Sequence, residues 1–227
     1  TPRLRYTHKP CAEVSLCIQI MSASHASALH TAVTDGSLAT VSHLLAACAD
    51  PSAAGGADER TPLHVAVLHE RHAVMQHLLG AGAALDAPNS MGSTPLHWAA
   101  ERGFLVSAGL LIQANARLDL KSRFGGSTAL HRAAGAGHAE VIRALAAAGA
   151  PLAARDDAGY TPLHWAAEFG QVASASALVE AGAPLDMLDR VGLTPHDVAA
   201  EHNKTEVMAI LEDTHESFDS SCNGHAK

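Results

Sequence analysis

The sequence is poor in aromatic residues and in charge. Only 4% of its 227 residues are aromatic and 17% are charged, so alanine, leucine and valine must fill the interior. Small and straight-chain apolar residues favour closely packed helices over strands. The apolar fraction of 48% is large enough to offset the entropy of the chain. The composition therefore predicts a folded, mainly helical protein.

Cysteine and long apolar runs are also scarce. The four cysteines, Cys11, Cys17, Cys48 and Cys222, form neither a C-x-x-C pair nor the dense pattern of a disulfide framework. This usage fits a reducing compartment. No apolar run approaches the roughly 18 to 20 residues that a membrane-spanning helix needs, so we expect no membrane span.

Basic charge is lacking in the last third of the chain. Residues 156–227 hold 3 basic and 13 acidic side chains, whereas residues 1–155 hold 12 and 10, and the net charge is -8. Nucleic-acid binding needs a basic surface that releases counterions, so DNA and RNA are disfavoured and a basic protein surface is the better partner. Residues 117–155 carry a local surplus of 6 basic over 2 acidic groups, so the charge changes sign along the molecule.

What the sequence does contain is one short motif in six copies. Successive copies begin 34, 33, 34, 33 and 33 residues apart, a regularity that excludes coincidence. The copies are SALHTAV at 27–33, TPLHVAV at 61–67, TPLHWAA at 94–100, TALHRAA at 128–134, TPLHWAA at 161–167 and TPHDVAA at 194–200.

Each copy contains the signals of a helix pair. A threonine such as Thr61 caps a helix, and the following Pro62 occupies a first-turn position where no N–H is needed. Leu63 and Ala66 then share one face, and the small alanine allows a neighbour to approach closely. Glycines follow most of these helices, and Asn115 takes the glycine place in the third copy.

This pattern resembles the ankyrin-repeat family, whose unit of about 33 residues carries a T-P-L-H-x-A signature. The resemblance implies an all-α solenoid over residues 25–213, with a helix-turn-helix and a hairpin loop in each repeat. It also implies that the motif histidines are structural and hydrogen-bond to neighbouring loop backbone; these are His30, His64, His97, His131 and His164. The divergent first and last copies suit capping repeats.

Two helices are expected to be the weakest in the stack. Ser107 and Gly109 lie in the second helix of the third copy, and Ser174 and Ser176 in that of the fifth. Apolar residues would stack better at these places. Gly109→Ala should stabilise the chain, provided that the missing side chain does not admit a neighbouring helix.

The two ends lie outside the repeats. Residues 1–24 form a leader, which we expect to be disordered or not native, with organelle import as one alternative because the composition is basic and rich in hydroxyls. A secretory signal fits less well, because its apolar stretch is short and broken by Gln19. Residues 214–227 lack periodicity and are expected to form a disordered tail.

The sequence contains no recognisable catalytic or cofactor motif. There is no P-loop, no G-x-S-x-G elbow and no Cys cluster, and His69, Glu70 and His72 lack the H-E-x-x-H spacing of a zinc protease. We therefore expect no enzyme activity, no catalytic residue, no cofactor and no metal site.

The resemblance places a partner on the concave face, made by the hairpin tips and the exposed ends of the first helices. Phe124, Tyr160 and Phe169 nominate repeats four and five, because interfaces favour rigid aromatic anchors; packing between adjacent repeats is the other interpretation. The predicted partner-binding residues are Arg60, Leu68, His69, Met91, Glu101, Arg102, Phe124, Asp157, Tyr160, Glu168, Phe169, Arg190, Glu201 and His202.

These observations predict a non-enzymatic protein-interaction module, an adaptor or scaffold with a protein partner. Two alternatives stay open. The chain could be a regulatory or assembly-chaperone subunit of an enzyme complex, of the proteasome-assembly type, or a fragment of a larger ankyrin-bearing signalling protein. We expect a monomer in the cytoplasm or nucleus.

Overall fold

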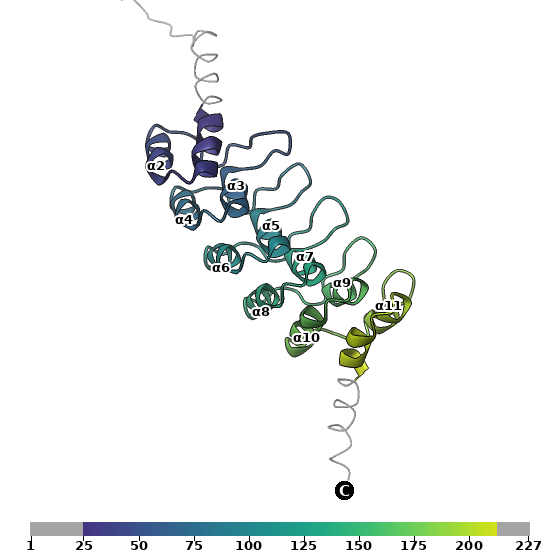
Figure 1. The fold of residues 1–227 in the computed structure, drawn as a ribbon. Helices are drawn as coiled ribbons and strands as arrows, with labels where there is room; N and C mark the ends of the chain where they lie inside the picture. The colour runs from purple at the N-terminus through teal and green to yellow at the C-terminus, as the bar shows by residue number, and fades with distance from the viewer. Residues whose placement is uncertain (1–24, 213–227) are drawn as a thin grey trace, which may run out of the picture.

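The helices stack as successive pairs along one direction, with a hairpin loop projecting from each junction (Figure 1). This computed structural model describes residues 25–212. The predictions for the leader, for the tail beyond residue 212 and for Cys11, Cys17 and Cys222 lie outside the described residues. Within them, the all-α solenoid predicted from the repeats is confirmed.

The helix bounds follow the motif copies. Residues 25–35 and 205–212 are helical at the two ends of the described chain. Between them lie α2 (Leu38–Ala46), α3 (Pro62–Leu68), α4 (His72–Gly80), α5 (Pro95–Arg102), α6 (Leu105–Gln113), α7 (Ala129–Ala136), α8 (Ala139–Ala147), α9 (Pro162–Phe169), α10 (Val172–Glu180) and α11 (Pro195–Glu201).

The helices form two parallel rows. The inner row contains the first helix of each repeat, with α3, α5, α7, α9 and α11 in contact one after another. The outer row contains the second helices, α2, α4, α6, α8 and α10, which contact each other in the same order (Figure 1). The two helices of a repeat pack on each other and bury their remaining apolar surface against the neighbouring repeats, so stability is shared between adjacent units.

The inner helices begin where the motif predicts. The backbone N–H of His64 donates to the Thr61 hydroxyl at 3.4 Å, and Thr61 N–H donates back to His64 Nδ1 at 3.2 Å. Thr194 and Asp197 form the same reciprocal pair in the last repeat, at 3.2 Å and 2.9 Å. This capping box satisfies backbone donors that a helix end would otherwise leave free.

The second helix ends in a left-handed residue. Asn115 takes this conformation with a φ of 67°, as expected, and Cys48 does so in the first repeat with a φ of 63°. Residues other than glycine rarely adopt it. Its use here turns the chain from the outer row back into the next hairpin.

The core is a continuous file of leucine and alanine. One leucine from each of the first five motif copies is fully buried: Leu29, Leu63, Leu96, Leu130 and Leu163. Full burial of each one stabilises the fold by about 2 kcal/mol. Among the buried polar residues, Ser107 in α6 and Ser174 in α10 have hydroxyls without a hydrogen-bond partner.

Candidate functional site: the hairpin face

The motif histidines connect each repeat to the next. His64 Nε2 lies 2.9 Å from the carbonyl oxygen of Ser93, at the base of the following hairpin. Equivalent contacts of 2.8 to 3.1 Å join His30 to Arg60, His97 to Ser127, His131 to Tyr160 and His164 to Leu193. Five imidazoles thus hold five hairpins in register.

The hairpins are also joined tip to tip. Backbone N–H groups donate to carbonyl oxygens of the preceding hairpin at 2.9 to 3.1 Å, in the pairs Ser90 to Asp58, Arg123 to Met91, Asp157 to Gly125 and Arg190 to Ala158. Because both ends of each hairpin are fixed, the loops form one rigid surface. We call this surface, together with the exposed ends of the inner helices, the hairpin face.

Most of the predicted partner-binding residues lie exposed on this face. The exposed ones are His69, Met91, Glu101, Arg102, Phe124, Asp157, Phe169, Arg190, Glu201 and His202. Four are partly buried: Arg60, Leu68, Tyr160 and Glu168. The structure therefore brings the set onto one side of the molecule, but four members contribute to packing as well.

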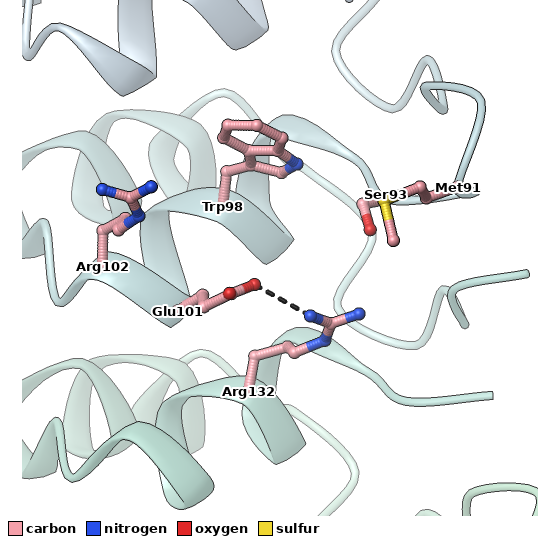
Figure 2. A pocket seen from close by; sticks show the side chains of 6 residues that line it. All are labelled: Met91, Ser93, Trp98, Glu101, Arg102 and Arg132. Atoms are coloured by element: carbon pink, nitrogen blue, oxygen red, sulfur yellow. Dashed lines mark hydrogen bonds and ion pairs between the residues drawn. The ribbon is translucent and has the colours of Figure 1, made fainter. Parts of the chain in front are cut away.

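A small hollow opens on the hairpin face between repeats three and four (Figure 2). It is lined by Met91, Ser93, Trp98, Glu101, Arg102 and Arg132. Arg132 crosses it and forms an ion pair with Glu101 at 2.8 Å, while its Nε donates to Ser127 Oγ at 2.9 Å. From the opposite side, the Arg60 guanidinium lies 4.6 Å from the centre of the Trp98 ring. Such a stacked cation adds favourable electrostatics to the packing.

The tyrosine and tryptophan of repeat five are held by packing. The Tyr160 ring stacks on His164 with 5.2 Å between centroids, and it is partly buried against the core. Trp165 packs edge-on against His131 at 5.8 Å and donates from Nε1 to Asp156 Oδ2 at 2.9 Å. For Tyr160, therefore, the packing interpretation fits the contacts better than a free interface anchor.

Phe169 and Phe124 leave more of their side chains exposed. Phe169 has 52% of its surface exposed although its ring meets the edge of Trp165, and Phe124 is 64% exposed at its hairpin tip. Large exposed apolar side chains gathered on one surface are typical of interaction sites. These two aromatics fit the interface interpretation.

Burial keeps the imidazoles of His64, His97, His131 and His164 neutral. It lowers the pKa of His64 and of His97 to about 4, although each ring donates from Nε2 to a backbone carbonyl oxygen of the next hairpin, which partly offsets the shift. The pKa values of His131 and His164 are also lowered, chiefly by burial. Neutral imidazoles with both nitrogens engaged have no lone pair left for a ligand.

The described residues 25–212 show neither a candidate metal site nor a candidate membrane span. That part of the chain has no group of three or more His, Cys, Asp or Glu side chains placed to hold a metal ion. Among its helices, none is long and apolar enough to cross a membrane.

Comparison with known protein families agrees with the repeat architecture described above. The family model for ankyrin repeats matches three overlapping segments, residues 29–122, 73–156 and 108–189. The chain belongs to the ankyrin-repeat family. Ankyrin repeats are protein-interaction modules, and the family is typically non-catalytic.

Several curated relatives share ankyrin repeats with this chain. Human NF-kappa-B inhibitor alpha is 35% identical over 103 residues, which are 43% of this chain and 32% of that protein. The tyrosine-protein kinase Shark of Drosophila melanogaster is 34% identical over 102 residues, 45% of this chain and 11% of the kinase. The chicken NF-kappa-B p105 subunit is 38% identical over 105 residues, which are 46% of this chain and 11% of that protein. The matched region thus spans about a third or less of these relatives.

Sequence reasoning missed two exposed apolar residues of the ankyrin hairpins. Val191 is 83% exposed and Leu188 is 49% exposed, both in the last hairpin. The signal was available: Val191 follows Arg190 at the tip, as Phe124 follows Arg123, and Met91 follows Ser90. Met91, Phe124 and Val191 therefore form a row of exposed apolar side chains along the tips.

Proposed function

We propose that this ankyrin-repeat chain is a non-enzymatic adaptor or scaffold that binds a protein partner on its hairpin face. One observation carries the proposal: Met91, Phe124 and Val191 expose 49%, 64% and 83% of their surfaces on hairpins that the histidines and backbone hydrogen bonds hold rigid. A rigid surface with apolar anchors loses little entropy on binding. The acidic C-terminal third disfavours nucleic acid and favours a protein with a basic surface.

The test compares two surfaces of the same chain. A triple variant, Met91→Ser, Phe124→Ser and Val191→Ser, removes the apolar tips. The matched control is Leu105→Ser with Val106→Ser on α6, which removes side chains that are 43% and 58% exposed on the outer row. Both variants are first shown by circular dichroism to keep the helical content of the parent.

The parent and both variants are then cross-linked in native extract, and the proteins captured with each are compared. The tip variant is expected to lose the dominant cross-linked protein that the parent and the α6 control retain. Loss with the α6 variant alone would move the binding surface to the outer row and overturn the proposal.

A regulatory role is the second candidate, favoured by the similarity to NF-kappa-B inhibitor alpha, a protein whose name describes inhibition. An adaptor leaves the activity of its partner unchanged, whereas a regulatory subunit alters it. Assay of the captured partner with and without the chain separates these functions.

The match covers only 32% of NF-kappa-B inhibitor alpha and 11% of the kinase Shark, which supports the proposal that the chain is part of a larger ankyrin-bearing protein. We further propose that the chain is monomeric and acts in the cytoplasm or nucleus.

A further inference from the structure

Repeat four lacks a side chain at one position of the hairpin face, and two aromatic rings of repeat five occupy the space. The eighth residue, counted from the Thr or Ser that opens each motif copy, is Gly135 in the fourth repeat, and in the other five it is Thr34, Leu68, Glu101, Glu168 or Glu201. A Cβ at Gly135 would lie 2.8 Å from Trp165 Cε3 and 3.2 Å from Phe169 Cδ2. The two rings therefore lie directly against the backbone of α7.

This aromatic surface is held in place before anything binds. The Trp165 indole donates to Asp156 Oδ2 at 2.9 Å, and its ring meets Phe169 edge-on with 6.1 Å between centroids. Gln171 Nε2 donates to the Gly135 carbonyl at 3.1 Å, which ties the start of α10 to α7. About half of Phe169 stays exposed, 52%, so a ring face remains available on a fixed support.

Carboxylates outnumber cations near this surface: three carboxylates lie on this part of the face, whereas one cation, Lys204, lies against Gly170, the residue after Phe169. Glu168 precedes Phe169, Glu201 lies at the same position one repeat later, and Asp157 lies in the adjoining hairpin. Within residues 25–212, none of these three carboxylates forms an ion pair. Burial and then the nearby carboxylates, Glu168 first among them, raise the pKa of the Tyr160 hydroxyl. The carboxylates thus act together on one part of the hairpin face.

The neighbouring part of the face has the opposite character. Arg132, which is paired with Glu101, and Arg102, which has no ion pair among the described residues, line the hollow between repeats three and four. Arg60, which is paired with Asp58, lies over the ring of Trp98. A cationic group is repelled there and attracted one repeat further on. The sign change therefore fixes where along the face a cation can lie.

We propose that the Trp165–Phe169 surface, flanked by Glu168 and Glu201, binds the cationic side chain of an arginine or lysine in a partner's segment. An exposed aromatic face attracts a cation through its ring quadrupole, and the flanking carboxylates add charge pairing. The inference rests on the proposed function, since it names the chemistry of the partner that the hairpin face recognises.

The test uses the intrinsic fluorescence of Trp165. Trp98→Phe removes the other tryptophan, so that the emission reports on this surface alone. The probes are a short peptide with two arginines among leucine, serine and glycine, and its twin with citrulline, the neutral isostere, at both positions. We expect saturable quenching by the arginine peptide and binding at least about tenfold weaker by the citrulline peptide, as the loss of a desolvated cation–aromatic contact predicts.

Two variants and one control locate the effect. Glu168→Gln keeps the shape and removes one charge, and Phe169→Leu removes the ring but keeps the residue apolar; each is expected to weaken the arginine peptide about tenfold. Glu180→Gln removes the same charge from α10, in the outer row, and should leave the affinity unchanged. Circular dichroism establishes that each variant is folded.

Three results would overturn the inference: equal binding of both peptides, no binding of the arginine peptide, or equal weakening by Glu168→Gln and Glu180→Gln. These results are distinct from failure of the proposed function. If the Met91, Phe124 and Val191 variant loses its partner while the arginine peptide fails to bind, the hairpin face is still the interface and only the cation specificity is wrong.

Discussion

His97 joins two repeats by accepting from one and donating to the next. Its Nδ1 accepts from Thr94 N–H at 3.2 Å, so the ring proton is on Nε2, which donates to the Ser127 carbonyl oxygen at 3.0 Å. A second proton on Nδ1 would face the Thr94 N–H and break this arrangement. The junction between repeats three and four therefore needs a neutral imidazole, and His64 has the same geometry one repeat earlier.

The first prediction is that mild acid destabilises the stack. Because burial lowers the folded-state pKa of His64 and His97 from 6.5 to about 4, unfolding takes up protons between these values. This contribution to stability is complete above pH 6.5 and is lost as the pH drops toward 4, by up to about 7 kcal/mol for the two sites together, at about 1.4 kcal/mol per pKa unit and site. Urea unfolding followed by circular dichroism from pH 7.5 to pH 4.5 measures this loss.

His97→Gln is the matched control for this prediction. Glutamine does not titrate but still offers an acceptor and a donor. The variant should be less stable than the parent at pH 7.5 and lose less stability on acidification. A parent free energy of unfolding that stays flat between pH 6.5 and pH 5 would show that the buried histidines are not linked to folding.

The fold was predictable because each of its signals acts locally. Thr61, Pro62 and Leu63 start a helix through capping, a fixed φ and burial, whatever the rest of the chain does. Repetition of such signals then sets the stack. The Asn115 turn is equally local, since it depends on one residue's tolerance of the left-handed conformation.

The site was less predictable because its residues depend on neighbours in space. The stacking of Tyr160 on His164 decides that it is a packing residue and not an interface anchor, and no sequence motif predicts that contact. The space that Trp165 and Phe169 fill is set by the glycine of the previous repeat, Gly135. Val191 could have been found by aligning hairpin tips, since its importance follows from position alone.

The second prediction concerns the unpartnered hydroxyl of Ser174 in α10. This hydroxyl is buried and makes no hydrogen bond, so its desolvation destabilises the fold and no hydrogen bond offsets that cost. Ser174→Ala should stabilise the chain by about 1 kcal/mol. Ser176→Ala on the partly exposed side of the same helix is the control, because it changes helix propensity by the same amount without removing a buried hydroxyl. Equal gains in thermal unfolding would mean that propensity alone is responsible.

The third prediction compares two helical glycines. A Cβ at Gly109 in α6 meets no atom within 4 Å, so Gly109→Ala should stabilise by about 0.5 to 1 kcal/mol through helix propensity. Gly135→Ala gains the same propensity but forces Trp165 and Phe169 to move, and should destabilise by about 1 to 3 kcal/mol. Urea midpoints that rise for both variants would show that the aromatic rings shift freely.

The last prediction tests how much the contact between neighbouring hairpins stabilises the hairpin face. Gly92 and Gly192 both have a positive φ, 73° and 97°, at corresponding places in their hairpins, so alanine is strained at either one. They differ in surroundings: a Cβ at Gly92 would lie 2.4 Å from the backbone N of Arg123 in the next hairpin, whereas one at Gly192 meets nothing within 4 Å. Gly192→Ala should therefore lower the free energy of unfolding by about 1 kcal/mol. Gly92→Ala should lower it further, because the two hairpins must also move apart. The difference between their free energies of unfolding isolates the contact, and amide exchange at Arg123 should accelerate only in the Gly92 variant. Equal costs with unchanged exchange would mean that the hairpins are held by the histidines alone.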